Sequence, residues 1–181
     1  MIDWRRSVFG KLSRRGRVSA MSAAKSGLPD YSTSDWLLLW LAIGEPKEIR
    51  GKTVFVKQIF VIAEEVIPQL LQKFNFYAHH FGPYSKEFET ALQQLVRMGM
   101  IDERMQADAE GIFSTSARHD YILTPKGEVR AVELSRGIPP SMAERLGQYK
   151  RLLSRMGYFG LLSYVYATYP EYTTMSELEI S

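Results

Sequence analysis

One group of polar side chains with helical spacing gives the strongest indication of chemistry in this sequence. Between residues 85 and 98, apolar residues recur at intervals of three and four, which predicts a helix with one continuous apolar face. The apolar positions are Phe88, Ala91, Leu92, Leu95 and Val96. With that face turned inward, the outward positions are Lys86, Thr90, Gln93, Gln94 and Arg97, and Ser85 is the N-terminal cap.

These outward side chains are of the types that contact DNA. Arg and Lys bind guanine edges or phosphates, and Gln pairs with adenine through two hydrogen bonds. Ser85 and the free backbone N–H groups of the first turn would hold a phosphate. The group therefore predicts a recognition helix for a DNA major groove, although a merely solvated polar face would have the same composition.

The segment after this helix predicts a two-stranded hairpin, the wing, with strands at 100–105 and 119–124. Residues 102–120 have a net charge of −3, whereas a wing that lies along phosphates should be neutral or basic. Its two arginines, Arg104 and Arg118, are therefore weaker candidates for DNA contact. The acidic wing would equally suit a basic protein partner.

The positive charge of the chain is concentrated near its N-terminus. Residues 1–25 carry a net charge of +6, while the rest of the chain carries −3. We expect residues 1–30 to form a basic arm without fixed structure, with translation starting at Met1 or at Met21. If the domain binds DNA, the arm would supply most phosphate contacts, or a dimer would turn its wings away. The arm arginines proposed for this role are Arg5, Arg6, Arg14, Arg15 and Arg17.

The elements before the recognition helix are predicted to be mainly helical. Residues 36–43 are too apolar for a surface helix, so we expect a buried core helix capped at 32–34 and ended by the Gly-Glu-Pro at 44–46. A second helix is expected over 53–67. Alternation over 74–81 predicts a short strand, followed by a turn at Gly82-Pro83.

Three further helices are predicted after the wing. Thr124-Pro125 begins one that runs to about residue 136. Apolar residues from Met142 to Met156 then follow a 4-3-4-3 spacing, which is typical of a helix–helix seam. Gly157 interrupts it, and a nearly all-apolar helix covers 159–169. Its tyrosines are expected to serve in core packing or a dimer interface.

Together these elements predict a mainly α fold with a small β-hairpin wing: a winged helix-turn-helix domain plus a C-terminal helical layer. The winged-helix domain would span 31–137. The helices within 138–170 would pack on it or form a homodimer through 141–169, and residues 171–181 would be a tail.

Several short motifs resemble the YwgA-like family of small prokaryotic proteins. They are Lys57-Gln58-Ile59-Phe60, the Phe-Gly-Pro-Tyr-Ser turn at 81–85, the helix end at 95–101, Leu-Thr-Pro-Lys-Gly at 123–127, and the tyrosine-rich segment 162–172. The likeness covers about residues 35–175. The helix and wing also resemble MarR-type and PadR-type regulators, and the Gly-Pro turn resembles the Panacea antitoxin-like domain. The resemblance implies a winged-helix domain and no catalytic residue.

Other functional classes find little support in the sequence. There is no cysteine, no phosphate-binding loop and no dinucleotide-binding or hydrolase motif, so we expect no enzyme activity and no cofactor. His79 and His80 would leave opposite faces of a strand, and although His119 would be able to approach one of them, we expect no metal site. No run of apolar residues is long enough to span a membrane, and no secretory signal is evident, so we expect a cytoplasmic protein.

The sequence thus predicts a winged-helix protein that binds double-stranded DNA. Its role would be that of a prokaryotic transcriptional regulator or antitoxin-like repressor, acting as a homodimer. The alternative is a protein-interaction module that keeps the winged-helix shape without binding DNA, an interpretation motivated by the acidic body and wing.

Overall fold

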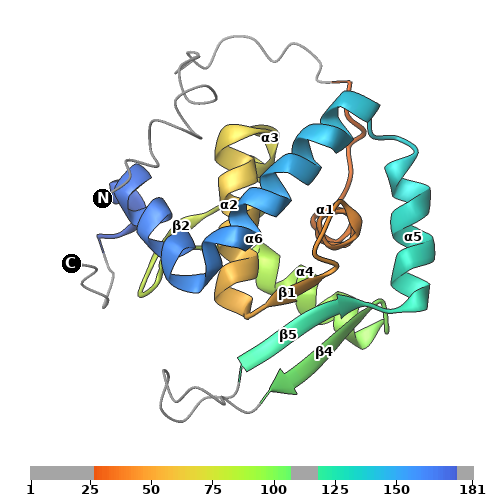
Figure 1. Cartoon of the computed structure of the whole chain (residues 1–181), viewed down its shortest axis with the longest axis horizontal. Coiled ribbons are helices and arrows are strands. Elements are labelled where there is room, and N and C mark those ends of the chain that lie inside the picture. Colours follow the sequence, from red (N-terminus) through yellow and green to blue (C-terminus); the bar gives the residue numbers. More distant parts are fainter. Residues whose placement is uncertain (1–26, 107–117, 175–181) are drawn as a thin grey trace.

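The computed structural model describes residues 27–106 and 118–174, which form a mainly helical body with small antiparallel sheets (Figure 1). The helices are α1 (Thr33–Ala42), α2 (Lys52–Glu65), α3 (Gln69–Phe74), α4 (Lys86–Arg97), α5 (Pro125–Ser135) and α6 (Pro140–Thr168), followed by the 3₁₀ turn η2 (Pro170–Tyr172). The strands are β1 (Glu48–Arg50), β2 (Tyr77–His79), β3 (Gly82–Tyr84), β4 (Ile101–Gln106) and β5 (Arg118–Leu123).

The core helix expected at 36–43 is α1, and its burial is confirmed. Ser32 and Asp35 form a capping box in which each side chain accepts a hydrogen bond from the backbone N–H of the other. All residues from Trp36 to Leu41 are buried, since α4 and α5 pack on this helix and α6 reaches its C-terminal end. A helix that is apolar on every side requires such an enclosed position.

The wing belongs to a three-stranded sheet with the order β1-β5-β4. The hairpin strands β4 and β5 pair in antiparallel register, with Ile101 opposite Leu123 and Gln106 opposite Arg118. The predicted hairpin is therefore confirmed. The short strand β1 pairs with the other edge of β5, and its three residues are too few to show an alternating pattern in the sequence.

The strand expected over 74–81 is wrong in its bounds. Phe74 ends helix α3, and Asn75 follows it in the left-handed conformation with φ of 47°. The extended residues form the hairpin β2–β3, in which Gly82 and Pro83 lie in a strand rather than in the turn. Pro83 is tolerated there because a two-stranded ribbon leaves one side of each strand without ladder hydrogen bonds.

The two C-terminal helices predicted from the sequence are joined in α6, which bends at Gly157, where φ is 64° and ψ is −172°. The seam residues Leu146, Tyr149 and Leu153 are buried within the chain, because α6 packs on α2. These three residues therefore pack within the chain, and the homodimer expected through 141–169 stays a prediction.

The tail expected from residue 171 begins instead with ordered structure. Residues of η2 pack back on the body, and the ring of Tyr172 lies 4.8 Å from that of Phe60 in an edge-to-face contact. Residues 175–181 lie outside the described part of the chain.

The helices form layers, with α1 and α2 in the middle. In Figure 1, α6 crosses the near face and α4 lies behind. Contacts agree with this view, because α2 packs on α6 while its Phe55 ring contacts Phe88 of α4 at 5.1 Å. The outer surfaces of α4 and α6 therefore face in different directions.

Two helical glycines predict opposite effects of adding a methyl group. A Cβ on Gly127, in the first turn of α5, would lie 2.0 Å from the carbonyl oxygen of Met100, whereas a Cβ on Gly147 in α6 would meet nothing closer than 3.7 Å. Gly127→Ala should lower the free energy of unfolding by about 1–3 kcal/mol or more, through steric overlap. Gly147→Ala should raise it by about 0.5–1 kcal/mol, through helix propensity.

Urea denaturation of the two variants and the wild type would measure this difference. Equal stability of Gly127→Ala and the wild type would contradict the close approach of α5 to the connection between α4 and β4.

Candidate nucleic-acid interface

The rotation of α4 about its own axis is fixed by apolar contacts on one side. Phe88 packs edge-to-face against Phe55 of α2, with an interplanar angle of 84°. Phe88, Ala91, Leu92 and Leu95 are all buried, as the periodicity predicts, and Val96 is half-buried. Packing against α1, α3 and β4 thus covers one face of α4 and leaves the opposite face outside.

The outer face of α4 carries the polar residues expected there. Lys86, Thr90, Gln93, Gln94 and Arg97 are all exposed. Part of this face borders a shallow, open hollow between α4 and the start of α1. Its lining residues are Thr33, Lys86, Glu87, Thr90, Ala91 and Gln94. The five side chains are brought together on one accessible surface.

The structure corrects the phosphate-binding role predicted for Ser85. Its side chain is fully buried, with 0% exposure. The hydroxyl caps α4 by accepting a hydrogen bond from the N–H of Phe88 at 2.9 Å, and it donates to the carbonyl oxygen of Phe74. Both functions of the hydroxyl are used internally, so Ser85 positions α4 and has no access to a phosphate.

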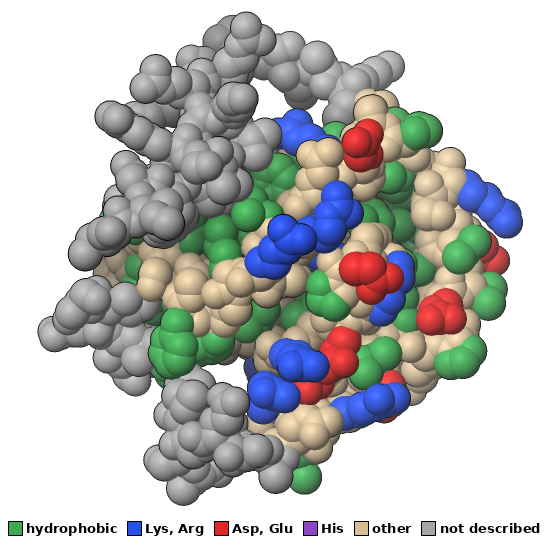
Figure 2. Space-filling view, viewed as in Figure 1, with side chains coloured by type: hydrophobic (Ala, Val, Ile, Leu, Met, Phe, Trp, Pro, Cys, Tyr) green, Lys and Arg blue, Asp and Glu red, His purple; other side chains and the backbone are tan. Residues whose placement is uncertain are grey.

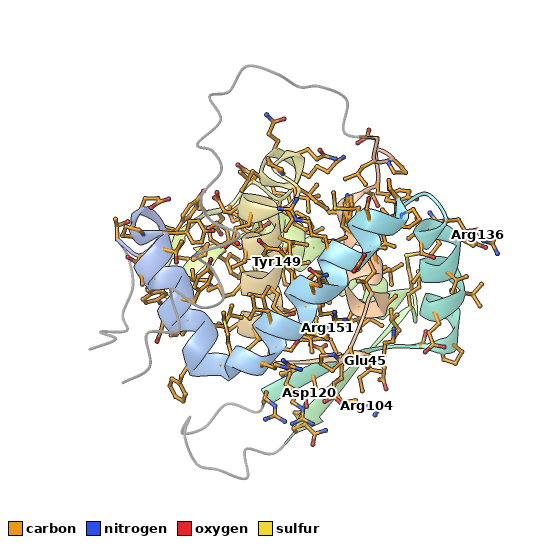
Figure 3. The ribbon with its side chains drawn as sticks, turned by 45° about the horizontal axis from the view of Figure 1, so that its top comes forward. Glu45, Arg104, Asp120, Arg136, Tyr149 and Arg151 are labelled. Atoms are coloured by element: carbon orange, nitrogen blue, oxygen red, sulfur yellow. The ribbon has the colours of Figure 1, made fainter. Side chains whose placement is uncertain are left out.

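The two wing arginines are exposed, but each already pairs with an aspartate. Arg104 donates to the carboxylate of Asp102 at 2.8 Å, and Arg118 makes a two-point contact with Asp120 at 2.8 and 3.1 Å. Figure 3 shows Arg104 and Asp120 on the wing hairpin. Asp120 is only 2% exposed, and Arg118 is the cation that pairs with its buried carboxylate. Diverting Arg118 to a phosphate would leave a buried carboxylate unpaired, so the wing is poorly suited to bind phosphates.

Most basic side chains in the described residues already have an acceptor. Of the 16 lysines and arginines there, 11 donate to a carboxylate or a backbone carbonyl of another described residue. The five without such an acceptor among described residues are Lys86, Arg97, Arg136, Arg151 and Arg155. Two of the five therefore lie on the outer face of α4.

The predicted arm lies outside the described residues. Arg5, Arg6, Arg14, Arg15 and Arg17 fall within 1–26, so the structure places none of these candidate phosphate contacts, and the arm remains a prediction from charge.

A carboxylate–tyrosine cluster joins α2 to the C-terminal layer, and the sequence did not reveal it. Glu65, the last residue of α2, accepts hydrogen bonds from the hydroxyls of Tyr149 (3.0 Å), Tyr164 and Tyr169 (2.9 Å). Burial, reinforced by the adjacent Glu65 charge, raises the pKa of Tyr149 to about 12. The cluster fixes α6 and its C-terminal turn on α2. The signal available in the sequence was a carboxylate at the end of an apolar helix, with six tyrosines between residues 149 and 172.

Two lysines are buried without a carboxylate partner. Lys57 of α2 donates to the carbonyl oxygen of Pro83 at 2.7 Å, which holds the β2–β3 hairpin just before α4. Lys150 of α6 donates to the carbonyl oxygens of Trp40 and Leu41 at 2.6 and 2.7 Å, at the C-terminal end of α1. Cations at a helix C-terminus complement its unpaired carbonyls and its dipole. Periodicity alone gives no signal for either contact.

The described residues contain no group of three or more His, Cys, Asp or Glu side chains able to hold a metal ion. His79 lies on the β2–β3 hairpin, whereas His119 lies on β5 in the other sheet, with its Nδ1 3.3 Å from a Glu103 oxygen. No helix within 27–106 or 118–174 is long and apolar enough to cross a membrane. The chain matches no protein-family model and no curated protein sequence.

The buried lysines predict a stability that rises with pH. Burial lowers the pKa of both Lys57 and Lys150 to about 7, whereas an unfolded chain keeps the ordinary 10.5. Between these values the unfolded state binds more protons, so the free energy of unfolding should increase from pH 7 toward pH 10, by up to about 1.4 kcal/mol per pH unit for each lysine. Above pH 10, tyrosines whose pKa is raised by burial should reverse the trend.

Urea denaturation across this pH range measures how the free energy of unfolding changes with pH. The double variant Lys57→Met, Lys150→Met should show a smaller change, even if its stability at any one pH differs from that of the wild type. A double variant with the wild-type slope would show that these two amines do not cause the pH dependence.

Proposed function

We propose that this protein is a winged-helix protein that binds duplex DNA through the outer face of α4. The order α1-β1-α2-α4-β4-β5 and the sheet order β1-β5-β4 support the winged-helix assignment. In this assignment α3 and the β2–β3 hairpin are an insertion between the two helices of the helix-turn-helix. The hairpin leads directly into Ser85 and therefore sets the start of the recognition helix.

The observation that carries the proposal is the combination of exposure and chemistry on α4. Lys86 and Arg97 stand at opposite ends of the helix, exposed and without an acceptor among described residues. Between them lie the hydroxyl of Thr90 and the amides of Gln93 and Gln94. A helix in the major groove uses cations that reach phosphates or guanine and amides that pair with adenine. This face of α4 carries two of each.

The proposed role is that of a prokaryotic transcriptional regulator or antitoxin-like repressor acting in the cytoplasm. Since Arg104 and Arg118 are held by aspartates, the basic arm would supply phosphate contacts beyond those of α4. A homodimer would have to use exposed residues of 141–169 or another surface, because the apolar seam of α6 is buried.

A second candidate function is a protein-interaction module, and the wing favours it. The arginines of the described wing are neutralised, while Glu103 remains exposed beside them. A surface of this kind attracts a basic protein partner and repels a phosphate backbone.

Reversing the charges of Lys86 and Arg97 tests the DNA-binding proposal. The variant Lys86→Glu, Arg97→Glu should bind duplex DNA much more weakly than the wild type at low salt, while its melting temperature stays near that of the wild type because both side chains are exposed and have no acceptor among described residues. Fluorescence anisotropy with a labelled random duplex pool would measure binding.

Arg136→Glu provides a matched control, since Arg136 is also exposed and without an acceptor among described residues but caps the C-terminus of α5, away from α4. It should keep wild-type affinity. Undiminished binding by the α4 variant would exclude the recognition-helix role. Absence of duplex binding by the wild type itself would favour the interaction module.

A further inference from the structure

The outer side of α6 carries a second pair of cations that have no acceptor among the described residues. Arg151 and Arg155 are four residues apart, so their side chains project from the same side of the helix. Both are exposed, and neither forms an ion pair or a hydrogen bond with another described residue. Like charges at this spacing repel each other and slightly destabilise a helix, so the pair contributes nothing favourable to the described fold.

The first half of α6 carries more basic than acidic side chains, in contrast to the body around it. Within Pro140–Thr168, Glu144 is the only acidic residue, against Arg145, Arg151 and Arg155 at the surface and the buried Lys150. Residues 26–181 together carry a net charge of −3. The local excess of positive charge on α6 is therefore a feature of this surface and does not follow from the composition of the body.

The α6 surface is separate from the proposed recognition surface. Figure 2 shows Lys and Arg side chains gathered along α6 on the near face, whereas α4 lies behind in the same view. The buried layer of α1 and α2 separates the two helices, since α1 packs on α4 and α2 packs on α6. The two surfaces therefore lie on opposite sides of this layer.

We propose that the outer face of α6, through Arg151 and Arg155, binds the phosphate backbone of a second duplex DNA segment. Guanidinium groups form two parallel hydrogen bonds to a phosphate and are less strongly hydrated than ammonium groups, which suits them to this ligand. The contact is independent of base sequence, because two arginines on one helix side position a backbone without reading base edges. One molecule would thus hold two duplexes, one on each side of the α1–α2 layer.

The inference rests on the proposed function only in taking duplex DNA as the ligand. Its direct test uses the full chain with two duplexes that carry a donor and an acceptor fluorophore. The wild type should bring them together at low salt, giving energy transfer. Arg151→Glu, Arg155→Glu should abolish the transfer while still binding one duplex, and the magnitude of its log–log salt slope should fall by about two.

Arg136→Glu is again the matched control and should keep the energy transfer. In Figure 3, Arg136 lies at the C-terminal end of α5, well away from Arg151. Melting temperatures and far-UV circular dichroism of the variants should match the wild type. Unchanged energy transfer and salt slope in Arg151→Glu, Arg155→Glu would overturn the inference. Tighter binding of polyglutamate or of phosphatidylserine vesicles than of the duplex at these two arginines would also overturn it.

The two proposals fail in different ways. If Lys86→Glu, Arg97→Glu binds one duplex as the wild type does and the α6 variant binds none, the recognition-helix proposal fails and the α6 surface stands. The reverse pattern, with the α6 variant indistinguishable from the wild type and no binding by the α4 variant, removes the α6 surface and leaves the recognition helix.

Discussion

The packing of Phe88 against Phe55 decides which side of α4 faces outward, and the proposed function depends on that choice. The ring contact, together with the buried Ala91, Leu92 and Leu95, leaves one rotation available to the helix. Ser85 holds the start of α4 through Phe74, and Lys126 donates to the carbonyl of Met98 at its end. A helix fixed at both ends and along one face presents its remaining side chains as a rigid set, which lowers the entropic cost of binding a partner.

Around this helix, the fold places most of its charged groups in internal contacts. Lys150 donates to the carbonyls at the end of α1, and Lys57 holds the β2–β3 hairpin. Glu65 accepts hydrogen bonds from two tyrosines of α6 and from Tyr169, which follows that helix. Each contact ties a helix end or a short hairpin to a distant element. Buried groups of this kind are costly unless satisfied, so they specify one arrangement of the layers more than they stabilise it. Of the five cations left without acceptors among described residues, we propose that the four on α4 and α6 contact DNA.

Local patterns predicted the strong elements well. The apolar stripe of α4, the Thr124-Pro125 start of α5, the Gly157 break and the buried α1 follow from periodicity and capping within single segments. The three-residue strands and α3 were missed or misplaced because elements so short have no period to detect. The Gly82-Pro83 pair resembled a turn, yet Lys57, 26 residues earlier, holds it extended.

Local patterns also predicted part of the candidate site, and the rest depends on contacts between distant segments. The five exposed residues of α4 follow from one helix wheel. The burial of Ser85, in contrast, depends on a carbonyl of α3, and the wing arginines are paired with aspartates of their own strands. The contacts of Lys150, 109 and 110 residues from its acceptors, have no local signature at all. Composition therefore indicated where charge lies along the chain, and only the fold showed which charges remain available.

The most direct test of the central claim is to follow the backbone amide resonances of the ¹⁵N-labelled protein while unlabelled duplex DNA is added at low salt. The account predicts that the largest and earliest changes fall on α4, at Lys86, Thr90, Gln93, Gln94 and Arg97, while amides of the α1 core and of α5 stay unchanged. Changes confined to the wing or to α6, with α4 unaffected at saturation, would contradict it.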